Sequence, residues 1–198
     1  MPPATAVSAV TVLAALRLEA LCIGGGVVLM GMGHVKAGAA GSRLAPTLDP
    51  GRPLAIVGIA GGLETGLRPG QLVVADALHG PDGDDPLLLP HAASVADRLR
   101  AIGRDVRVGA VACSTSIVHG AARADLARGG ALAVEMESVW LARAVAGHPL
   151  VVVRAVGDTE QHGFVSGNIK ALMALRGLRP ALEAWARDLD GAPGNDLT

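Results

Sequence analysis

Short apolar runs rich in valine, leucine and isoleucine alternate along the chain with alanine- and leucine-rich stretches of helical spacing. A short continuous apolar run bounded by turn residues is typical of a buried strand, whereas apolar positions three and four residues apart are typical of a helix. The runs predict strands at residues 7–13, 27–30, 54–57, 71–76, 106–112, 132–135 and 150–156. The helical spacing predicts helices at residues 35–44, 91–102, 123–128, 138–146 and 168–189.

The alternation of strands and helices predicts an α/β fold, a three-layer sandwich in which a mixed, mostly parallel central sheet is flanked by helices. A chain of 198 residues has the usual size of one domain and buries a substantial core without disulfides or metals. We therefore expect a single domain over residues 1–190 and a flexible tail at residues 191–198. The polar segment 80–86 is expected to be a surface loop.

The composition narrows the classes of function. Apolar residues make up 51% of the chain, but there is no Tyr, one Phe and two Trp, so the expected core is aliphatic. The formal net charge is −1 and the basic residues are scattered, which argues against nucleic acid or an anionic membrane as a partner. Two cysteines without a CxxC pair indicate neither a disulfide framework nor a metal site, and a cytoplasmic location is expected.

The first 16 residues are apolar, but they lack a basic segment and are followed by Arg17 and Glu19. This pattern favours a first strand over a signal peptide or a membrane span. Glu19 therefore follows a predicted strand. It is either an exposed residue at a helix start or a candidate general base.

Two carboxylates follow the apolar run at residues 132–135, within the sequence AVEMESVW at 133–140. A helix N-terminus favours anionic side chains, so Glu137 with Ser138 could form a capping arrangement. Capping does not explain Glu135, which is so close to the predicted strand that its carboxylate needs hydrogen-bond donors. Because sugar hydroxyls are suitable donors, this segment is a candidate sugar-binding site.

Another apolar run leads to a carboxylate at Asp158. An aspartate in this place could be a turn or N-cap residue. Burial among aliphatic side chains would instead favour the protonated carboxyl group, which makes Asp158 a candidate proton donor to a leaving group. Arg154, four residues earlier, could orient the site or form a structural ion pair.

Glycines follow two of the predicted strands, in GIAGGL at residues 58–63, which includes Gly61, and in GMG at residues 31–33. Glycine at a strand end lets the backbone approach a ligand closely, although each segment could simply be a tight turn. In open α/β sheets the ligand lies at the carboxyl ends of the strands. The glycines and the carboxylates are therefore expected to share one site.

Taken together, these segments resemble the nucleoside phosphorylase superfamily, in the branch that contains methylthioadenosine/adenosylhomocysteine nucleosidases and purine and uridine phosphorylases. The match runs in order from about residue 12 to residue 158. VEME at 134–137 reproduces the family's ribose-binding motif, and RAVGD at 154–158 resembles its Arg-x-Ile-Ser-Asp segment with Gly157 in place of Ser. GG at 61–62 with PGQLVV at 69–74 matches the Gly-rich turn and the next strand.

The resemblance implies that Glu137 binds the ribose hydroxyls, that Met136 packs on the sugar and that Asp158 protonates a purine at N7. Glu19 occupies the position from which the nucleosidases activate water. The implied reaction is cleavage of an N-glycosidic bond through an oxocarbenium-like state, as in glycoside hydrolysis. The resemblance implies no metal and no organic cofactor. It implies a homo-oligomer, because family members usually assemble.

Two departures from the family pattern concern the nucleophile and the base. The phosphorylases bind phosphate with an Arg before the Gly-rich turn and a Ser or Thr within it, whereas Ile56, Ile59 and Ala60 stand here. A dianion needs cationic or backbone partners, so we expect hydrolysis, although the amides at residues 31–33 leave phosphate possible. Where nucleosidases carry a stacking Phe, Ile117 and Val118 are expected to form aliphatic walls around the base.

The short chain, the sequence LRLEA at 16–20, GMG at 31–33 and AVEMES at 133–138 are most similar to the hopanoid-cluster subgroup of this superfamily. That subgroup is associated with removing adenine from adenosylhopane to give a ribosylhopane. The alternatives are a methylthioadenosine or adenosylhomocysteine nucleosidase, and futalosine-type or other purine nucleoside cleavage. A non-enzyme alternative is a degenerate subunit that binds a nucleoside without turnover.

Overall fold

The computed structural model describes residues 8–158 and 164–191. Its strands are β1 (Thr11–Ala14), β2 (Val27–Leu29), β3 (Leu54–Gly62), β4 (Leu72–His79), β5 (Leu87–Leu88), β6 (Val106–Cys113), β7 (Ala133–Glu135) and β8 (Leu150–Val156). Its helices are α1 (Arg17–Ile23), α2 (His34–Leu44), α3 (Ala92–Ala101), α4 (Gly120–Arg128), α5 (Ser138–Ala144), α6 (Phe164–Ala174) and α7 (Arg179–Gly191), with a 3₁₀ turn at Ala45–Thr47.

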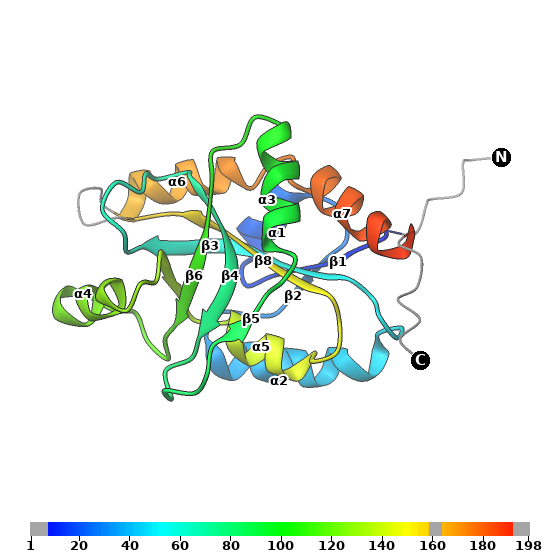
Figure 1. The fold of residues 1–198 in the computed structure, drawn as a ribbon, viewed down its shortest axis with the longest axis horizontal. Coiled ribbons are helices and arrows are strands. Elements are labelled where there is room, and N and C mark those ends of the chain that lie inside the picture. The colour runs from blue at the N-terminus through cyan, green and yellow to red at the C-terminus, as the bar shows by residue number, and fades with distance from the viewer. Residues whose placement is uncertain (1–7, 159–163, 192–198) are drawn as a thin grey trace.

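The strands of the described residues form one mixed eight-stranded sheet (Figure 1). The order is β2-β1-β3-β7-β6-β4-β5, and β8 pairs in parallel with β3 and antiparallel with β4. The path β3-β7-β6-β4-β8 therefore returns to β3, so these five strands form a closed ring. The mixed α/β sheet with flanking helices is confirmed, and the closure adds a feature that the alternation of elements did not predict.

Helices cover the sheet from two directions (Figure 1). Side chains of α1, α3, α6 and α7 pack in one buried aliphatic cluster with β1, β3, β4 and β8, and Trp185 is its one aromatic member. Side chains of α2 and α5 pack in a second cluster on alternate residues of the same strands. This alternation follows from the two-residue period of a strand, which sends successive side chains to opposite faces.

Several predicted elements are corrected by the structure. Residues 58–62 belong to β3 rather than to a turn, because Gly61 and Gly62 pair with β7. The predicted helix at 168–189 is two helices, α6 and α7, between which Gly177 has a φ of 74°. A φ in this region is favourable only for glycine, so the chain changes direction there. Helix α1 was not predicted as a helix.

The predicted ends of the chain are only partly described. Residue 7 of the first predicted strand lies outside the described residues, and the strand itself is at Thr11–Ala14. Gly191 is the last residue of α7, and the rest of the predicted tail, 192–198, lies outside the described residues. No helix in the part of the chain that the structure describes is long and apolar enough to cross a bilayer.

Candidate active site

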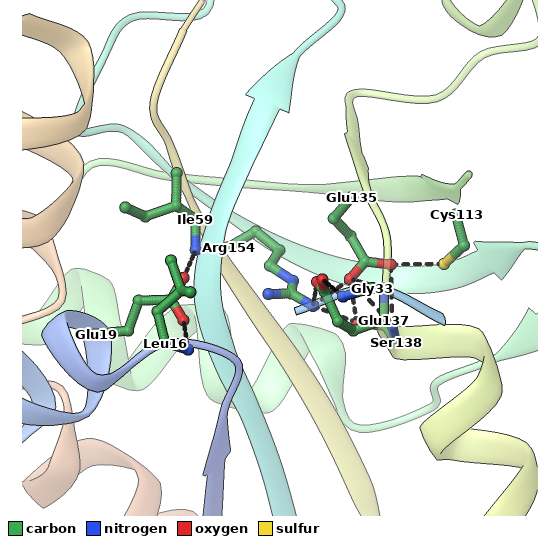
Figure 2. Close-up of polar contacts among 9 residues, drawn as sticks. All are labelled: Leu16, Glu19, Gly33, Ile59, Cys113, Glu135, Glu137, Ser138 and Arg154. Carbon is green, nitrogen blue, oxygen red and sulfur yellow. Dashed lines mark hydrogen bonds and ion pairs between the residues drawn. The ribbon is translucent and has the colours of Figure 1, made fainter. Parts of the chain in front are cut away.

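Four ionisable side chains from different elements converge in the interior (Figure 2). Glu19 comes from α1, Glu135 ends β7, Glu137 precedes α5, and Arg154 lies in the middle of β8. All four residues are buried. Charged groups are rarely buried unless they are paired, so the cluster needs an explanation by its contacts.

Glu135 is bonded entirely within the protein, and its side chain is 1% exposed. Its carboxylate accepts hydrogen bonds from the backbone N–H groups of Glu137 and Ser138, each at 3.0 Å, and from the Ser138 hydroxyl at 3.1 Å. It also pairs with Arg154 and accepts from the Cys113 thiol at 2.7 Å. The donors that Glu135 was expected to find in a sugar are thus protein groups.

The carboxylate that caps the N-terminus of α5 is therefore that of Glu135 and not that of Glu137. Glu137 occupies the N-cap position, but its side chain makes no capping hydrogen bond. Instead, Glu135 satisfies two of the backbone N–H groups that a helix N-terminus leaves without partners. Glu135 therefore fixes the backbone at the start of α5, and the side chain of Glu137 takes no part in capping the helix.

Glu137 turns toward the GMG segment, where its Oε1 accepts the backbone N–H of Gly33 at 2.8 Å. Gly33 has a φ of 93°, which other residues rarely adopt. Burial raises the pKa of the Glu137 carboxyl above its ordinary value of 4.5, although Arg154 acts in the opposite direction. The Gly33 amide is consequently engaged by a carboxylate, and this reduces the donors that the segment could offer an anion.

Arg154 lies at the centre of the cluster with a side chain that is 0% exposed. Its guanidinium pairs with Glu135, bonds the Ser138 hydroxyl at 2.8 Å and lies 3.7 Å from Glu137 Oε2. Burial disfavours the charge, but the surrounding carboxylates outweigh burial and raise the pKa of the guanidinium above its usual range. Among the described residues, Nε and Nη1 have no hydrogen-bond partner.

Glu19 is buried rather than exposed, which excludes its interpretation as a solvated residue at a helix start. Its Oε2 accepts the backbone N–H of Leu16 and its Oε1 that of Ile59, both at 2.8 Å. A Cβ atom added to Gly58 would lie 2.8 Å from Glu19 Oε1 and 2.5 Å from Arg154 Nη1. The Glu19 carboxylate and the Arg154 guanidinium therefore both lie over Gly58, where any side chain would collide with them.

Asp158 follows β8, and its backbone carbonyl accepts the N–H of Gly62 at 2.8 Å. Its Oδ2 accepts from Arg123 Nη1 at 2.8 Å, so its surroundings are not the purely aliphatic pocket that the sequence suggested. A Cβ atom on Gly61 would lie 3.3 Å from Asp158 Oδ1. Gly58, which Glu19 faces, and Gly61, which Asp158 faces, are three residues apart on β3, a rise of roughly 10 Å along the strand.

The remaining candidates differ in their placement. Met136 is half-buried, with its Cε 4.0 Å from where a Cβ atom on Gly33 would stand. Ile117 is 65% exposed. Val118 is half-buried and lines a hollow of about 350 Å³ together with Cys113 and side chains of α4. In the described part of the chain, none of the clustered carboxylates lines this hollow.

One residue of the site was missed in the sequence. Arg123 appears there only as the first residue of a predicted helix, and nothing in its spacing relates it to a partner 35 positions away. The contact arises because α4 lies beside the ends of β3 and β8, where Arg123 also donates to the Gly62 carbonyl at 2.6 Å. A sequence pattern carries no signal for such a contact.

Comparisons with known proteins agree with this architecture. A family model described as the phosphorylase superfamily matches residues 17–174. No curated protein matches the sequence. Among solved structures, a mutant methylthioadenosine nucleosidase of Helicobacter pylori with 5′-methylthioadenosine in its active site has a TM-score of 0.74 at 17% identity, covering 90% of this chain and 98% of that chain.

Two further structures have the same fold. Futalosine hydrolase of Helicobacter pylori has a TM-score of 0.74 at 18% identity, covering 90% of this chain and 97% of its own. A 5′-methylthioadenosine/S-adenosylhomocysteine nucleosidase of Neisseria meningitidis, in complex with methylthio-immucillin-A, has a TM-score of 0.69 at 20% identity, covering 91% and 98%.

Proposed function

The chain belongs to the phosphorylase superfamily, and on this premise we propose that it cleaves the N-glycosidic bond of an adenosyl compound and releases adenine. The observation that carries the proposal is that Glu19, Glu137 and Arg154 are buried and converge beside β3. Asp158, which follows β8, lies near Gly61 farther along β3.

Glu137 is the proposed sugar ligand. The N–H of Gly33 holds one of its oxygens, and an ionised carboxylate has further lone pairs with which to accept ribose hydroxyls. Glu135 supports this role by fixing the backbone of Glu137, while Met136 lies beside Gly33 for contact with the sugar. Binding and support are thus divided between the two carboxylates of one motif.

The proposed reaction is hydrolysis. As the C1′–N9 bond breaks, its electron pair leaves with the base, and Asp158 in its acid form gives a proton to N7. A water oxygen bonds to C1′, and Glu19, anchored by two backbone amides, accepts the proton that this water loses. Arg154 Nε and Nη1, which have no hydrogen-bond partner among residues 8–158 and 164–191, would orient the water or a sugar hydroxyl.

Water is favoured over phosphate by the charges that surround the proposed nucleophile. Arg154 is the cation of the cluster, and its charge is already opposed by Glu135 and Glu137. A phosphate dianion entering beside these carboxylates would meet repulsion, and a further cation would be needed to offset it. The aliphatic residues Ile56 and Ile59 supply no such cation.

Within this reaction we propose adenosylhopane as the substrate and a ribosylhopane as the product. Exposed apolar side chains support a large apolar 5′ substituent, because Leu18 precedes Glu19 and because Met32 and Val35 flank Gly33. The second candidate is a methylthioadenosine, adenosylhomocysteine or futalosine nucleosidase, which the similarity to solved structures of those enzymes favours.

The test is incubation of the purified protein with adenosylhopane, methylthioadenosine, adenosylhomocysteine and futalosine, each with and without phosphate. Chromatography then measures the free base. We expect adenine from adenosylhopane without phosphate, and we expect Glu137→Gln to weaken substrate binding and lower the rate. Adenine from methylthioadenosine alone would favour the second candidate. Release that requires phosphate would contradict hydrolysis, and no base from any nucleoside would indicate a binding subunit.

A further inference from the structure

Helix α4 contributes a cation to the carboxylate proposed as the proton donor. Arg123 Nη1 donates to Asp158 Oδ2 at 2.8 Å. Its Nη2 donates to the Gly62 carbonyl at 2.6 Å and to the backbone carbonyl of Asp158 at 3.2 Å. One guanidinium thus joins the end of β3 to both the side chain and the backbone of the residue that follows β8.

The position of Arg123 is unusual for its helix. All residues of α4 are described, and none of them is buried. Figure 1 shows α4 apart from the helices that cover the sheet. The Arg123 side chain is nevertheless 11% exposed, because its guanidinium reaches under the helix to the strand ends. In contrast, Arg128 of the same helix is 73% exposed and pairs with Asp125, three residues earlier.

The geometry around Asp158 leaves its two oxygens in different surroundings. Oδ2 accepts from Arg123 Nη1, whereas Oδ1 faces Gly61, where an added Cβ atom would lie 3.3 Å from Oδ1 and 3.3 and 3.4 Å from Arg123 Nη1 and Nη2. The guanidinium fork engages a carboxylate oxygen and a carbonyl from one rigid plane, which fixes orientation better than a lysine ammonium would. Arg123 therefore restrains the direction in which the second oxygen is presented.

We propose that Arg123 is a positioning residue that holds the carboxyl group of Asp158 toward the leaving base and acts on the reaction through Asp158 alone. This role rests on the proposed function of Asp158 as the group that contacts and protonates the base. A purely structural ion pair between α4 and the strand ends would instead affect folding without distinguishing one leaving group from another.

The leaving group provides the decisive comparison. Adenine departs poorly unless a proton reaches it, whereas 4-nitrophenolate leaves 4-nitrophenyl β-D-ribofuranoside as a stable anion. Loss of a group that acts through the proton donor should slow release of adenine far more than release of nitrophenolate. A variant that is only partly folded should instead release adenine and nitrophenolate more slowly by similar factors.

The experiment compares Arg123→Gln, Arg123→Lys and Asp158→Asn with Arg128→Gln as the control on the same helix. With an adenosyl substrate, we expect Arg123→Gln to lower kcat by about 10- to 100-fold with little change in KM. Arg123→Lys should recover part of this loss. Cleavage of the nitrophenyl riboside should change by less than about threefold, and Arg128→Gln should match the wild type in both assays.

Two further measurements complete the test. The double variant Arg123→Gln/Asp158→Asn should be no slower than Asp158→Asn, because residues that act through one group are not additive. Calorimetry of adenine binding does not depend on turnover, and Arg123→Gln should weaken binding by roughly tenfold while Arg128→Gln does not. Thermal unfolding midpoints show whether each variant is folded.

Several results would overturn the role of Arg123. Equal losses on both substrates, additive losses in the double variant, or unchanged adenine binding in folded Arg123→Gln would each do so. If the wild type cleaves neither compound, the proposed function fails. Adenine binding then decides separately whether Arg123 positions Asp158 toward a base.

Discussion

Replacing Glu135 by glutamine tests the buried ion pair with the smallest possible change of shape. The variant keeps the volume of the side chain but removes the carboxylate charge that contacts the fully buried Arg154 guanidinium, while Glu137 Oε2 remains 3.7 Å away. Breaking a buried pair in this way costs about 3–5 kcal/mol. The Ser138 N–H donates to both carboxylate oxygens, so in either orientation of the new amide its NH2 group would face that donor and leave a polar group unsatisfied.

Urea unfolding measures this loss directly. At an m value of about 2 kcal/mol/M, a loss of about 4 kcal/mol moves the midpoint down by about 2 M. The matched control is Glu64→Gln, because Glu64 pairs with Arg107 at 2.7 Å while both side chains are about two-fifths exposed. An exposed pair of this kind contributes only about 0–1 kcal/mol.

If Glu135→Gln is destabilised no more than Glu64→Gln, the buried pair does not contribute as its burial implies. A second comparison separates charge from packing. Replacing both partners by apolar residues, as in Glu135→Leu with Arg154→Met, should be less destabilising than Glu135→Leu alone, because the guanidinium then no longer stands in the interior without the carboxylate it contacts. Glu137 and Glu19 stay buried in this double variant and keep the backbone N–H groups of Gly33 and of Leu16 and Ile59 as partners.

Three other predictions follow from the same cluster. In Gly58→Ala, the new Cβ atom would lie 2.5 Å from Arg154 Nη1 and 2.8 Å from Glu19 Oε1, so the two groups would have to retreat by about 0.9 and about 0.6 Å to reach 3.4 Å. We expect an activity loss of about 100-fold, whereas Gly26→Ala, with nothing within 4 Å, should be neutral. Because the pKa of Glu137 is raised in the folded state, its ionisation destabilises folding above pH 4.5. Denaturant titrations should therefore show Glu137→Gln gaining stability over the wild type as pH rises through and above that value, and a constant difference would contradict this. Burial raises the pKa of the Cys113 thiol well above its usual value, so mass spectrometry of the folded protein after iodoacetamide treatment should show half-buried Cys22 labelled before Cys113; equal labelling would argue against it.

The elements that the sequence predicts best are those whose burial is continuous. The limits of β8 are predicted correctly because its apolar residues are uninterrupted except at Arg154. The apolar sequence of the strand does not explain why a buried arginine is stable within it. Its compensation comes from carboxylates on other elements, which are separated from it in sequence and meet it only after folding.

The glycines at residues 58–62 illustrate a different difficulty. Glycine is common in turns, so local propensity favours a turn, but here its lack of a side chain serves a strand. Gly58 leaves room for two charged groups, and Gly61 and Gly62 pair with β7. Tertiary contacts decide between the two uses of glycine, and a single sequence does not contain them.

The candidate carboxylates could be found in the sequence because they follow predicted strands, but their division of labour could not. Glu135 and Glu137 are two residues apart, and only the helix entry directs the first toward the protein and the second toward Gly33. Likewise, Arg123 reaches Asp158 through the placement of α4. These contacts depend on the packing of whole elements rather than on local spacing.

We propose that this cluster directs water at a glycosidic bond, and Glu19 is the residue on which that role depends. The measurement is the rate of adenine release from the adenosyl substrate in phosphate-free buffer, for the wild type and for Glu19→Gln. The glutamine keeps an oxygen that can accept the N–H of Ile59 but cannot take a proton from water. We expect the rate to fall by at least about 100-fold, the usual contribution of a general base. An unchanged rate, or release by the wild type only after phosphate is added, would contradict the account.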